Sequence, residues 1–364
     1  MDDRNPEVPS GPRPIEAVGT SVAAFVGVAE GGPPTPTYVE SWGSYTQRWP
    51  GRSPIGDAVE EFFRNGGSLA WIAAVESLKP GSVRRAIEAM HRDVSLVAVV
   101  ADPPPSPEVI GAAAQGLADR PAMLLVEGAW PDAASAIEAM SADRVAPIGA
   151  TGSNVAVYWP RVRRPVGQDP EEEISPLGAV AGIFARTDAT LGVFKAPAGT
   201  RAVLNGVSGT AATAGRSELD ELNQLGVNVI RGFPGTGTVI WGARTQSTES
   251  EWRYVPVRRT ALFLQASLAR GLAWAVFEPN AEPLWQSVRI AIERFLHRLF
   301  QDGAFAGRRP QDSYFVKCDA STMTQNDIDT GRLVCLLGFA PSRAAEFVTL
   351  RIGQWTRDAD HGPE

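Results

Sequence analysis

The hydrophobic and polar positions of the first half of the chain follow two alternating periods. Short apolar runs, typical of buried strands, cover residues 21–28, 69–75, 94–100 and 122–126. Patterns with helical spacing separate them at residues 55–65, 83–91, 107–119 and 133–140. The first of these patterns stops at Gly66 and Gly67, a typical helix C-cap. Strands that alternate with helices predict repeated βαβ units and a mostly parallel sheet.

The pattern changes after residue 150. Residues 155–160 are expected to form a strand that enters a basic, Pro-rich turn at residues 161–165. An Ala/Gly-rich helix is expected over residues 175–186. Glu171, Glu172 and Glu173 are expected to head this helix, because acidic residues suit a helix N-terminus.

The chain from about residue 220 looks like a second α/β unit. Helical patterns cover residues 219–225, 257–269 and 283–300. Strand patterns cover residues 227–230, 238–241, 272–277, 313–318, 332–338 and 346–352. The helix at 283–300 has the clearest apolar stripe, formed by Trp285, Val288, Ile292, Phe295, Leu296 and Leu299. The expected fold class is therefore α/β with two α/β domains.

Composition limits the chemistry that the chain can perform. The 364 residues carry a net charge of −7, which argues against nucleic acid as the main partner. Three His residues leave little material for zinc sites or His-based acid/base catalysis. Phosphate-binding loops and dinucleotide-binding motifs are missing from the sequence. We therefore expect no cofactor, no metal and no catalytic residues, and a protein that is not an enzyme.

Three weak signals have alternative interpretations. Asp327 and Asp329 precede Gly331, as in a calcium loop, but a capped turn is favoured because further oxygen ligands are lacking. The repeated βαβ units leave open an α/β ligand-binding protein or enzyme. Arginine clusters allow either local ion pairs or a docking surface for an acidic partner. They consist of Arg161, Arg163, Arg164, Arg258, Arg259, Arg308 and Arg309.

The sequence also bears on compartment. The N-terminus has no apolar core of a signal peptide, and no apolar run is expected to span a bilayer. We expect assembly in the cytoplasm without a signal peptide and no membrane insertion. Cys318 and Cys335 lie in apolar segments and are expected to be buried free thiols.

A series of short blocks resembles the tail sheath protein family of contractile phages and phage-tail-like contractile injection systems. The blocks cover roughly residues 7–355 and are strongest after residue 225. In the C-terminal half they include NVIRGFPG at 228–235, WGART at 241–245, EWRYV at 251–255, FEPN at 277–280, FVKCD at 315–319 and AEFV at 345–348. Upstream they include TSVAAFVG at 20–27, AGIFARTD at 181–188 and VFKAPA at 193–198.

The resemblance implies a structural role. The chain would polymerise as stacked rings around an inner tube in an extended metastable state, and would contract to drive the tube through a target envelope. Its partners would be further copies of itself, the inner tube protein, and baseplate and cap proteins. Residues 1–8 lack the β pattern of the family's N-terminal donor strand. A shortened arm, a start further upstream, or a specialised non-contracting, baseplate- or cap-proximal isoform would each explain this difference.

The resemblance also implies a domain order and two interaction sites. We expect an extended N-terminal arm at 1–20, an outer or middle domain at 21–225 and an inner C-terminal domain at 226–345 that also includes the N-terminal segment. Residues 346–364 would be a strand and tail donated to a neighbouring subunit. The inter-subunit strand would consist of Glu346, Phe347, Val348, Thr349, Leu350, Arg351 and Ile352. The tube-facing residues would be Arg289, Arg294 and Arg298.

Overall fold

The computed structural model describes residues 13–143, 149–166, 169–342 and 348–355, and the chain divides into two compact units. The middle unit is Gly19–Leu262, and the end unit combines Met1–Val18 with Phe263–Glu364. Helix α8 (Val255–Gly271) contributes its first residues to the middle unit and the rest to the end unit. The chain is therefore divided between residues 262 and 263, whereas we expected a boundary between residues 225 and 226. The strands that follow residue 226 extend the sheet of the middle unit and so belong to it.

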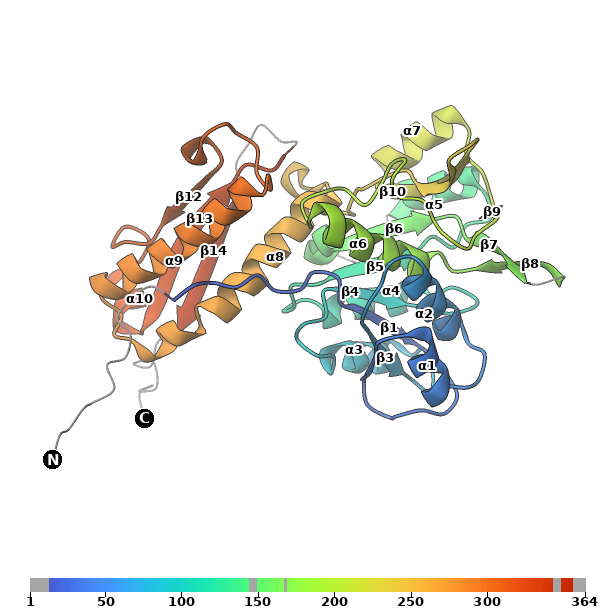
Figure 1. Cartoon of the computed structure of the whole chain (residues 1–364), viewed down its shortest axis with the longest axis horizontal. Helices are drawn as coiled ribbons and strands as arrows, with labels where there is room; N and C mark the ends of the chain where they lie inside the picture. Colours follow the sequence, from blue (N-terminus) through green and yellow to red (C-terminus); the bar gives the residue numbers. More distant parts are fainter. Residues whose placement is uncertain (1–12, 144–148, 167–168, 343–347, 356–364) are drawn as a thin grey trace. The chain divides into compact units, whose positions relative to one another are not determined.

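An eight-stranded sheet forms the centre of the middle unit (Figure 1). Its strands, in spatial order, are β11 (Gly237–Ile240), β10 (Val227–Phe233), β6 (Val155–Trp159), β5 (Met123–Glu127), β4 (Leu96–Val99), β1 (Ala23–Gly27), β3 (Ala70–Ala74) and β2 (Thr37–Val39). The six inner strands pair in parallel, whereas β2 and β11 pair antiparallel at the two edges. The predicted α/β class with a sheet rich in parallel strands is confirmed.

Successive strand residues point to opposite faces of this sheet, so both faces carry apolar side chains. Helices cover both faces. Phe25 belongs to the core on the face of α1 (Trp42–Arg48), α2 (Pro54–Arg64) and α6 (Leu177–Leu191), whereas Val26 belongs to the core under α3 (Pro80–Glu88) and α4 (Pro107–Gly116). Two further helices, α5 (Ala133–Asp143) and α7 (Arg216–Gln224), pack beside Trp159 and Val229.

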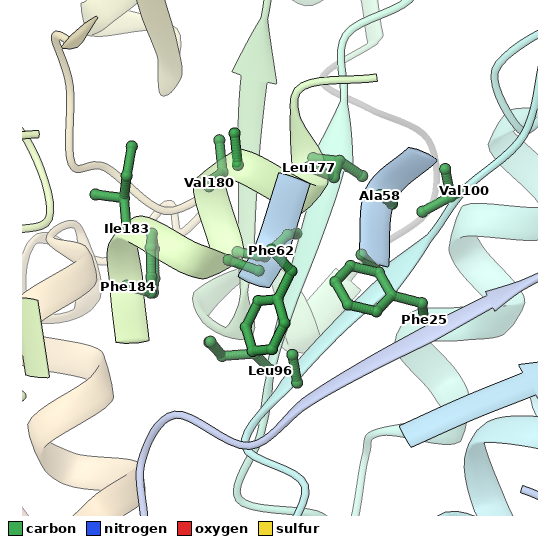
Figure 2. Close-up of a cluster of buried hydrophobic side chains, with 14 of the residues drawn as sticks. Phe25, Ala58, Phe62, Leu96, Val100, Leu177, Val180, Ile183 and Phe184 are labelled. Atoms are coloured by element: carbon green, nitrogen blue, oxygen red, sulfur yellow. The ribbon is translucent and has the colours of Figure 1, made fainter. Parts of the chain in front are cut away.

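Close packing of α2 on α6 forms the centre of the first core (Figure 2). A Cβ atom at Gly178 would lie 2.1 Å from the carbonyl oxygen of Ala58, and one at Gly182 would lie 2.5 Å from that of Phe62. Only glycine allows the two backbones to approach this closely. The Ala/Gly-rich composition that predicts α6 is therefore a packing requirement.

A second, small sheet replaces the expected turn and helix start at residues 161–173. Strand β7 (Val162–Val166) pairs with β8 (Asp169–Ile174) and β9 (Gly209–Thr210). Glu172 lies opposite Arg164, and Glu173 lies opposite Arg163. The prediction that Glu171–Glu173 head a helix is wrong, because cross-strand pairing with arginines places these acids in a hairpin.

The end unit contains a three-stranded antiparallel sheet. Strand β13 (Arg332–Phe339) lies between β12 (Tyr314–Lys317) and β14 (Val348–Trp355). Helix α9 (Glu282–Gln301) contacts β12, and the short helix α10 (Gln325–Asp329) contacts β13. The predicted strand at 272–277 is wrong: Ala273–Phe277 is a 3-10 helix. Short apolar runs do not distinguish a strand from a buried helical segment.

The N-terminal segment joins the end unit. Ile15 is 1% exposed and packs closely against Gly271. A Cβ atom added at Gly271 would lie only 2.8 Å from Ile15 Cγ2. The amide of Val18 donates to Ser267 Oγ at 3.2 Å, and Arg13 lies over the ring of Trp274. These contacts explain why residues far apart in the sequence form one compact unit.

The two cysteines form a disulfide and are not free thiols. Cys318 follows β12 and Cys335 lies in β13, with Cα atoms 4.5 Å apart. Both are buried, as expected, but the antiparallel register of β12 and β13 places them opposite each other. A spacing of 17 residues does not reveal such a register.

One stretch corrects the expectation about membrane spans. Residues Val255–Phe277 are long and apolar enough to cross a membrane by length and composition, the one such helix among the described residues. Half of its most apolar window is buried. Because the core helix of a globular protein meets the same criterion, this stretch is weak evidence for insertion.

Candidate interaction surfaces

Helix α9 carries the arginines that we expect to face the tube. The helix begins after Ala281 with Pro283 in its first turn, and its apolar side is buried. The buried residues are Leu284, Val288, Ala291, Ile292, Phe295 and Leu296. Arg289, Arg294 and Arg298 are all exposed.

The three arginines differ in their contacts. Arg298 Nη2 donates to the carbonyl oxygen of Ile15 at 2.5 Å, so Arg298 holds the N-terminal segment on α9. Arg289 lies 3.6 Å from Glu293, an exposed pair of small energetic value. Arg289 and Arg294 are therefore better placed than Arg298 to meet a partner.

Strand β14 forms one edge of the end-unit sheet. Eight residue pairs join it to β13, from Arg332–Trp355 to Phe339–Val348. Within the single chain, the strand residues Val348, Thr349, Leu350, Arg351 and Ile352 thus pair with their own β13. Glu346 and Phe347 lie outside the described residues. Donation of this strand to a neighbour remains a prediction.

Most of the clustered arginines form local ion pairs. Arg161 Nε lies 2.9 Å from Glu127 Oε1, and Arg163 lies 3.4 Å from Glu173. Arg309 lies 2.8 Å from Asp312. The interpretation of these clusters as local pairs therefore holds for these positions.

Arg164 organises a network of three carboxylates. Its guanidinium lies 2.6 Å from Asp57, 3.2 Å from Glu60 and 3.3 Å from Glu172. The network attaches the β7–β8 hairpin to α2. Glu61 lies beside it with no exposed side-chain surface.

Glu61 should make stability fall as pH rises. Burial raises the pKa of Glu61 to about 7, against the opposing charges of Arg64 and Arg164. In the unfolded chain the pKa of this carboxyl is about 4.5. The stabilisation that the neutral, buried Glu61 contributes to the folded state is therefore fully present below pH 4.5 and is lost as pH rises through about 7. Relative to Glu61→Gln, we expect wild type to lose about 1–3 kcal/mol between pH 5 and pH 8 in urea unfolding. Exposed Glu30→Gln is the control, and parallel pH profiles for wild type and Glu61→Gln would contradict the assignment.

A buried ion pair joins three elements of the middle unit. Arg259 Nη1 and Nη2 donate to Asp188 Oδ1 and Oδ2 at 2.7 and 2.6 Å, and both side chains are at most 5% exposed. Arg259 Nη2 also donates to the Thr20 carbonyl at 2.8 Å, while Thr20 Oγ1 donates to Asp188 Oδ2 at 2.6 Å. Arg259 stacks over the ring of Phe184. We call this set the clasp. Sequence patterns revealed Arg259 as basic but gave no signal for its partner.

The candidate calcium loop is a capped helix start. Asp327 Oδ2 accepts from the Thr324 amide at 2.9 Å, and the Asp327 amide donates to Thr324 Oγ1 at 3.1 Å. Among the described residues, no group of three or more His, Cys, Asp or Glu side chains is placed to hold a metal ion. The capped-turn interpretation therefore holds.

Two family models match adjacent parts of the chain. The phage tail sheath protein central domain matches residues 108–246, and the phage tail sheath C-terminal domain matches residues 247–354. The tail sheath protein of Vibrio phage KVP40 is 29% identical over 185 residues, which are 50% of this chain. The matched region spans only 27% of that curated relative's length.

Solved structures match nearly the whole chain. The anti-feeding prophage helical sheath in the contracted state is 31% identical with a TM-score of 0.77, and 97% of each chain is covered. The sheath complex of an extracellular contractile injection system, PVC, in the contracted state is 29% identical with a TM-score of 0.77, covering 98% of this chain and 96% of that one. A chain of the anti-feeding prophage baseplate is 30% identical with a TM-score of 0.75, and 97% of each chain is covered. The chain belongs to the tail sheath protein family of contractile phages and contractile injection systems, whose matched members are structural proteins and not enzymes.

Proposed function

We propose that this chain is a subunit of a contractile sheath. It polymerises around an inner tube in an extended metastable state and contracts to drive the tube through a target envelope. The observation that carries this proposal is the match along 97% of both chains to a helical sheath in its contracted state. Family models for both the central and the C-terminal sheath domains support it.

Negative-stain microscopy of the chain, expressed alone and with its inner tube protein, tests the proposal. Long hollow cylinders are the expected result. Monomers that bind a small molecule instead would favour an α/β ligand-binding protein. The test is direct because polymer formation requires no knowledge of the target or the trigger.

A baseplate-proximal isoform is the second candidate. The similarity to a chain of the anti-feeding prophage baseplate, with 30% identity, favours it specifically. Such an isoform would form short rings that never elongate, whether or not the tube protein is present. Its partners would be baseplate or cap proteins in addition to other sheath subunits.

The domain roles follow from the same proposal. The end unit, with the N-terminal segment and α9, would form the inner layer beside the tube, and the middle unit would project outward. Assembly would take place in the cytoplasm without a signal peptide. The particle would be a phage tail or a phage-tail-like particle.

Strand β14 would be exchanged between subunits. In the single chain it occupies the edge of a three-stranded sheet and pairs with β13 along its whole length. The same pairing made with the β13 of a neighbour would preserve every backbone hydrogen bond and link the two copies. Residues 340–347 would then connect the subunits, and contraction could proceed as rigid-body rotation about such connections.

Charge reversal on α9 should weaken tube recruitment. Arg289→Glu with Arg294→Glu removes two exposed cations without touching the Arg298–Ile15 contact. We expect about a tenfold loss of co-sedimenting tube, with sheath–sheath contacts maintained. Arg308→Glu, an exposed reversal elsewhere in the end unit, is the control. Unchanged tube recruitment would show that α9 faces something else.

A further inference from the structure

A polar hollow on the middle unit has no role in the proposals above. It has a volume of about 460 Å³. Two arginines and three hydroxyl-bearing residues line it, and none of its lining residues is acidic. Since the Thr245 hydroxyl donates to the Trp252 carbonyl, the hydroxyl donors left for a ligand are those of Ser247 and Thr248. The lining residues are Gln224, Gly226, Arg244, Thr245, Ser247, Thr248 and Arg253. This composition suits carboxylate groups, which accept hydrogen bonds from both kinds of donor.

One buried side chain fixes the backbone of Arg244. Asn228 in β10 has no exposed surface. Its Oδ1 atom accepts from the Arg244 amide at 2.7 Å, and its Nδ2 donates to the Arg244 carbonyl at 2.8 Å. Both backbone groups of Arg244 are therefore held by a single amide, as in a strand pair. A side chain at Gly242 would clash with Asn228 Oδ1, at 2.9 Å from its Cβ.

The loop that carries Arg253 is fixed in the same way. The Thr245 amide donates to the Arg253 carbonyl at 2.9 Å, and Thr245 Oγ1 donates to the Trp252 carbonyl at 2.6 Å. Gln246 Nε2 donates to the Gly226 carbonyl at 2.7 Å. The backbone of both arginines is thus held before any partner arrives, which reduces the entropic cost of binding.

The two arginines keep their charge available. Within the described part of the chain neither forms an ion pair, and Arg244 lies over the ring of Tyr254, with its guanidinium carbon 5.8 Å from the ring centroid. Glu249 and Glu251, the acids of the same loop, are close enough to Arg258 for their charges to act on it. Two exposed aromatic residues lie close to the arginines in sequence: Trp241 is 43% exposed and packs on Phe233, and Tyr254 is 39% exposed. Arginine, tryptophan and tyrosine are the residues that dominate binding energy at protein interfaces.

A complementary segment lies in the end unit. Phe277 is 69% exposed, the highest exposure among the large exposed hydrophobic residues described. Glu278 and Glu282 follow it, and Glu282 is exposed at the first position of α9. Asn280 Oδ1 accepts from Trp285 Nε1 at 2.8 Å and fixes the turn between the two acids. Residues 278–282 therefore present two carboxylates in a defined turn.

We propose that the polar hollow of one copy binds residues 278–282 of a second copy, an inference that rests on the proposed sheath function. Glu278 and Glu282 of one copy pair with Arg244 and Arg253 of the other. The two surfaces differ, so the contact is head-to-tail and repeats from copy to copy, as a helical polymer requires.

A charge swap tests the contact in the full chain co-expressed with its tube protein. Arg244→Glu with Arg253→Glu should lower pelleted sheath about tenfold or more, and Glu278→Arg with Glu282→Arg should do the same. Combining all four substitutions should restore wild-type yield to within about twofold. Arg253→Glu alone changes an exposed position and should fold even if the double variant does not, so a loss of polymers in this variant reports on the contact. Arg201→Glu with Arg216→Glu, exposed arginines outside the hollow, is the matched control.

The outcomes separate this inference from the sheath proposal. Wild-type polymers together with normal polymers of Arg244→Glu/Arg253→Glu would overturn the contact and leave the sheath function intact. Folded single-side variants that lose polymers but are not rescued by the combined swap would also overturn the pairing of these two segments. A wild-type chain that forms no polymer would overturn both proposals.

Discussion

Substitution of either member of the clasp should strongly destabilise the middle unit. Asp188→Ala leaves the Arg259 guanidinium buried without its bidentate carboxylate, and Arg259→Ala leaves the carboxylate buried alone. Removing one partner of such a pair typically costs about 3–5 kcal/mol, because the remaining charge stays desolvated. Chemical denaturation followed by tryptophan fluorescence and circular dichroism measures the loss.

A double variant separates pairing from packing. Asp188→Leu with Arg259→Met replaces both charges by apolar groups of similar size, and we expect it to recover most of the lost stability. Arg201→Ala, at an exposed position in the same unit, should change stability by less than about 0.5 kcal/mol. If Asp188→Ala and Arg259→Ala unfold at the wild-type denaturant concentration, the clasp does not hold α6 and α8 together.

Removal of residues 346–364 should abolish polymers completely. This truncation deletes β14, which pairs with β13 at eight positions. The middle unit has its own core and should remain folded, so we expect soluble protein with its cooperative unfolding transition and no cylinders by microscopy. Deletion of residues 356–364 alone keeps β14 and is the matched control.

A cross-link shows whether β14 pairs within or between chains. Leu336 lies opposite Arg351 in the register, so Leu336→Cys with Arg351→Cys places two thiols across the ladder. Exchange in the polymer predicts a ladder of covalent oligomers on a non-reducing gel, whereas pairing within one chain predicts monomers. Each single cysteine variant controls for random oxidation. Truncated protein that still assembles would contradict strand donation.

Periodicity identified most of the regular elements of the middle unit. Alternating apolar runs and helical patterns marked β1, β3, β4, β5 and β6 and the helices between them, because each strand is buried on both faces. The spatial order of the strands was not accessible from pattern alone. It depends on which helices cover each face, a property of the folded chain.

The errors lie where tertiary partners decide local structure. Residues 161–173 carry a proline and unlike charges, which favoured a turn and a helix start; pairing of Arg163 with Glu173 makes them a hairpin. The sequence signal for a hairpin was the run of basic residues before the turn, followed by the run of acidic residues after it. Cys318 and Cys335 were expected to be free because only the β12–β13 register brings them together.

The candidate sites were predictable only in outline. Four of the six residues in the predicted stripe of α9 are buried, whereas Trp285 and Leu299 are half-buried. The contact of Arg298 with Ile15 joins segments 283 residues apart in sequence. Asn228 and Asp188 lie in blocks that carry the family resemblance, but no pattern indicated their contacts, since Arg244 and Arg259 lie 16 and 71 residues away in sequence. Residues of this kind emerge only when the fold places the partner beside them.

Helical reconstruction by cryo-electron microscopy, before and after a contraction stimulus, tests the central claim most directly. Particles from cells that co-express this chain with its tube and baseplate proteins would be imaged intact and after brief exposure to denaturant. The account predicts one subunit in two lattices: a long, narrow sheath around the tube, and a shorter, wider sheath from which the tube is released. A single lattice that never changes, or a chain that never forms a sheath, would contradict it.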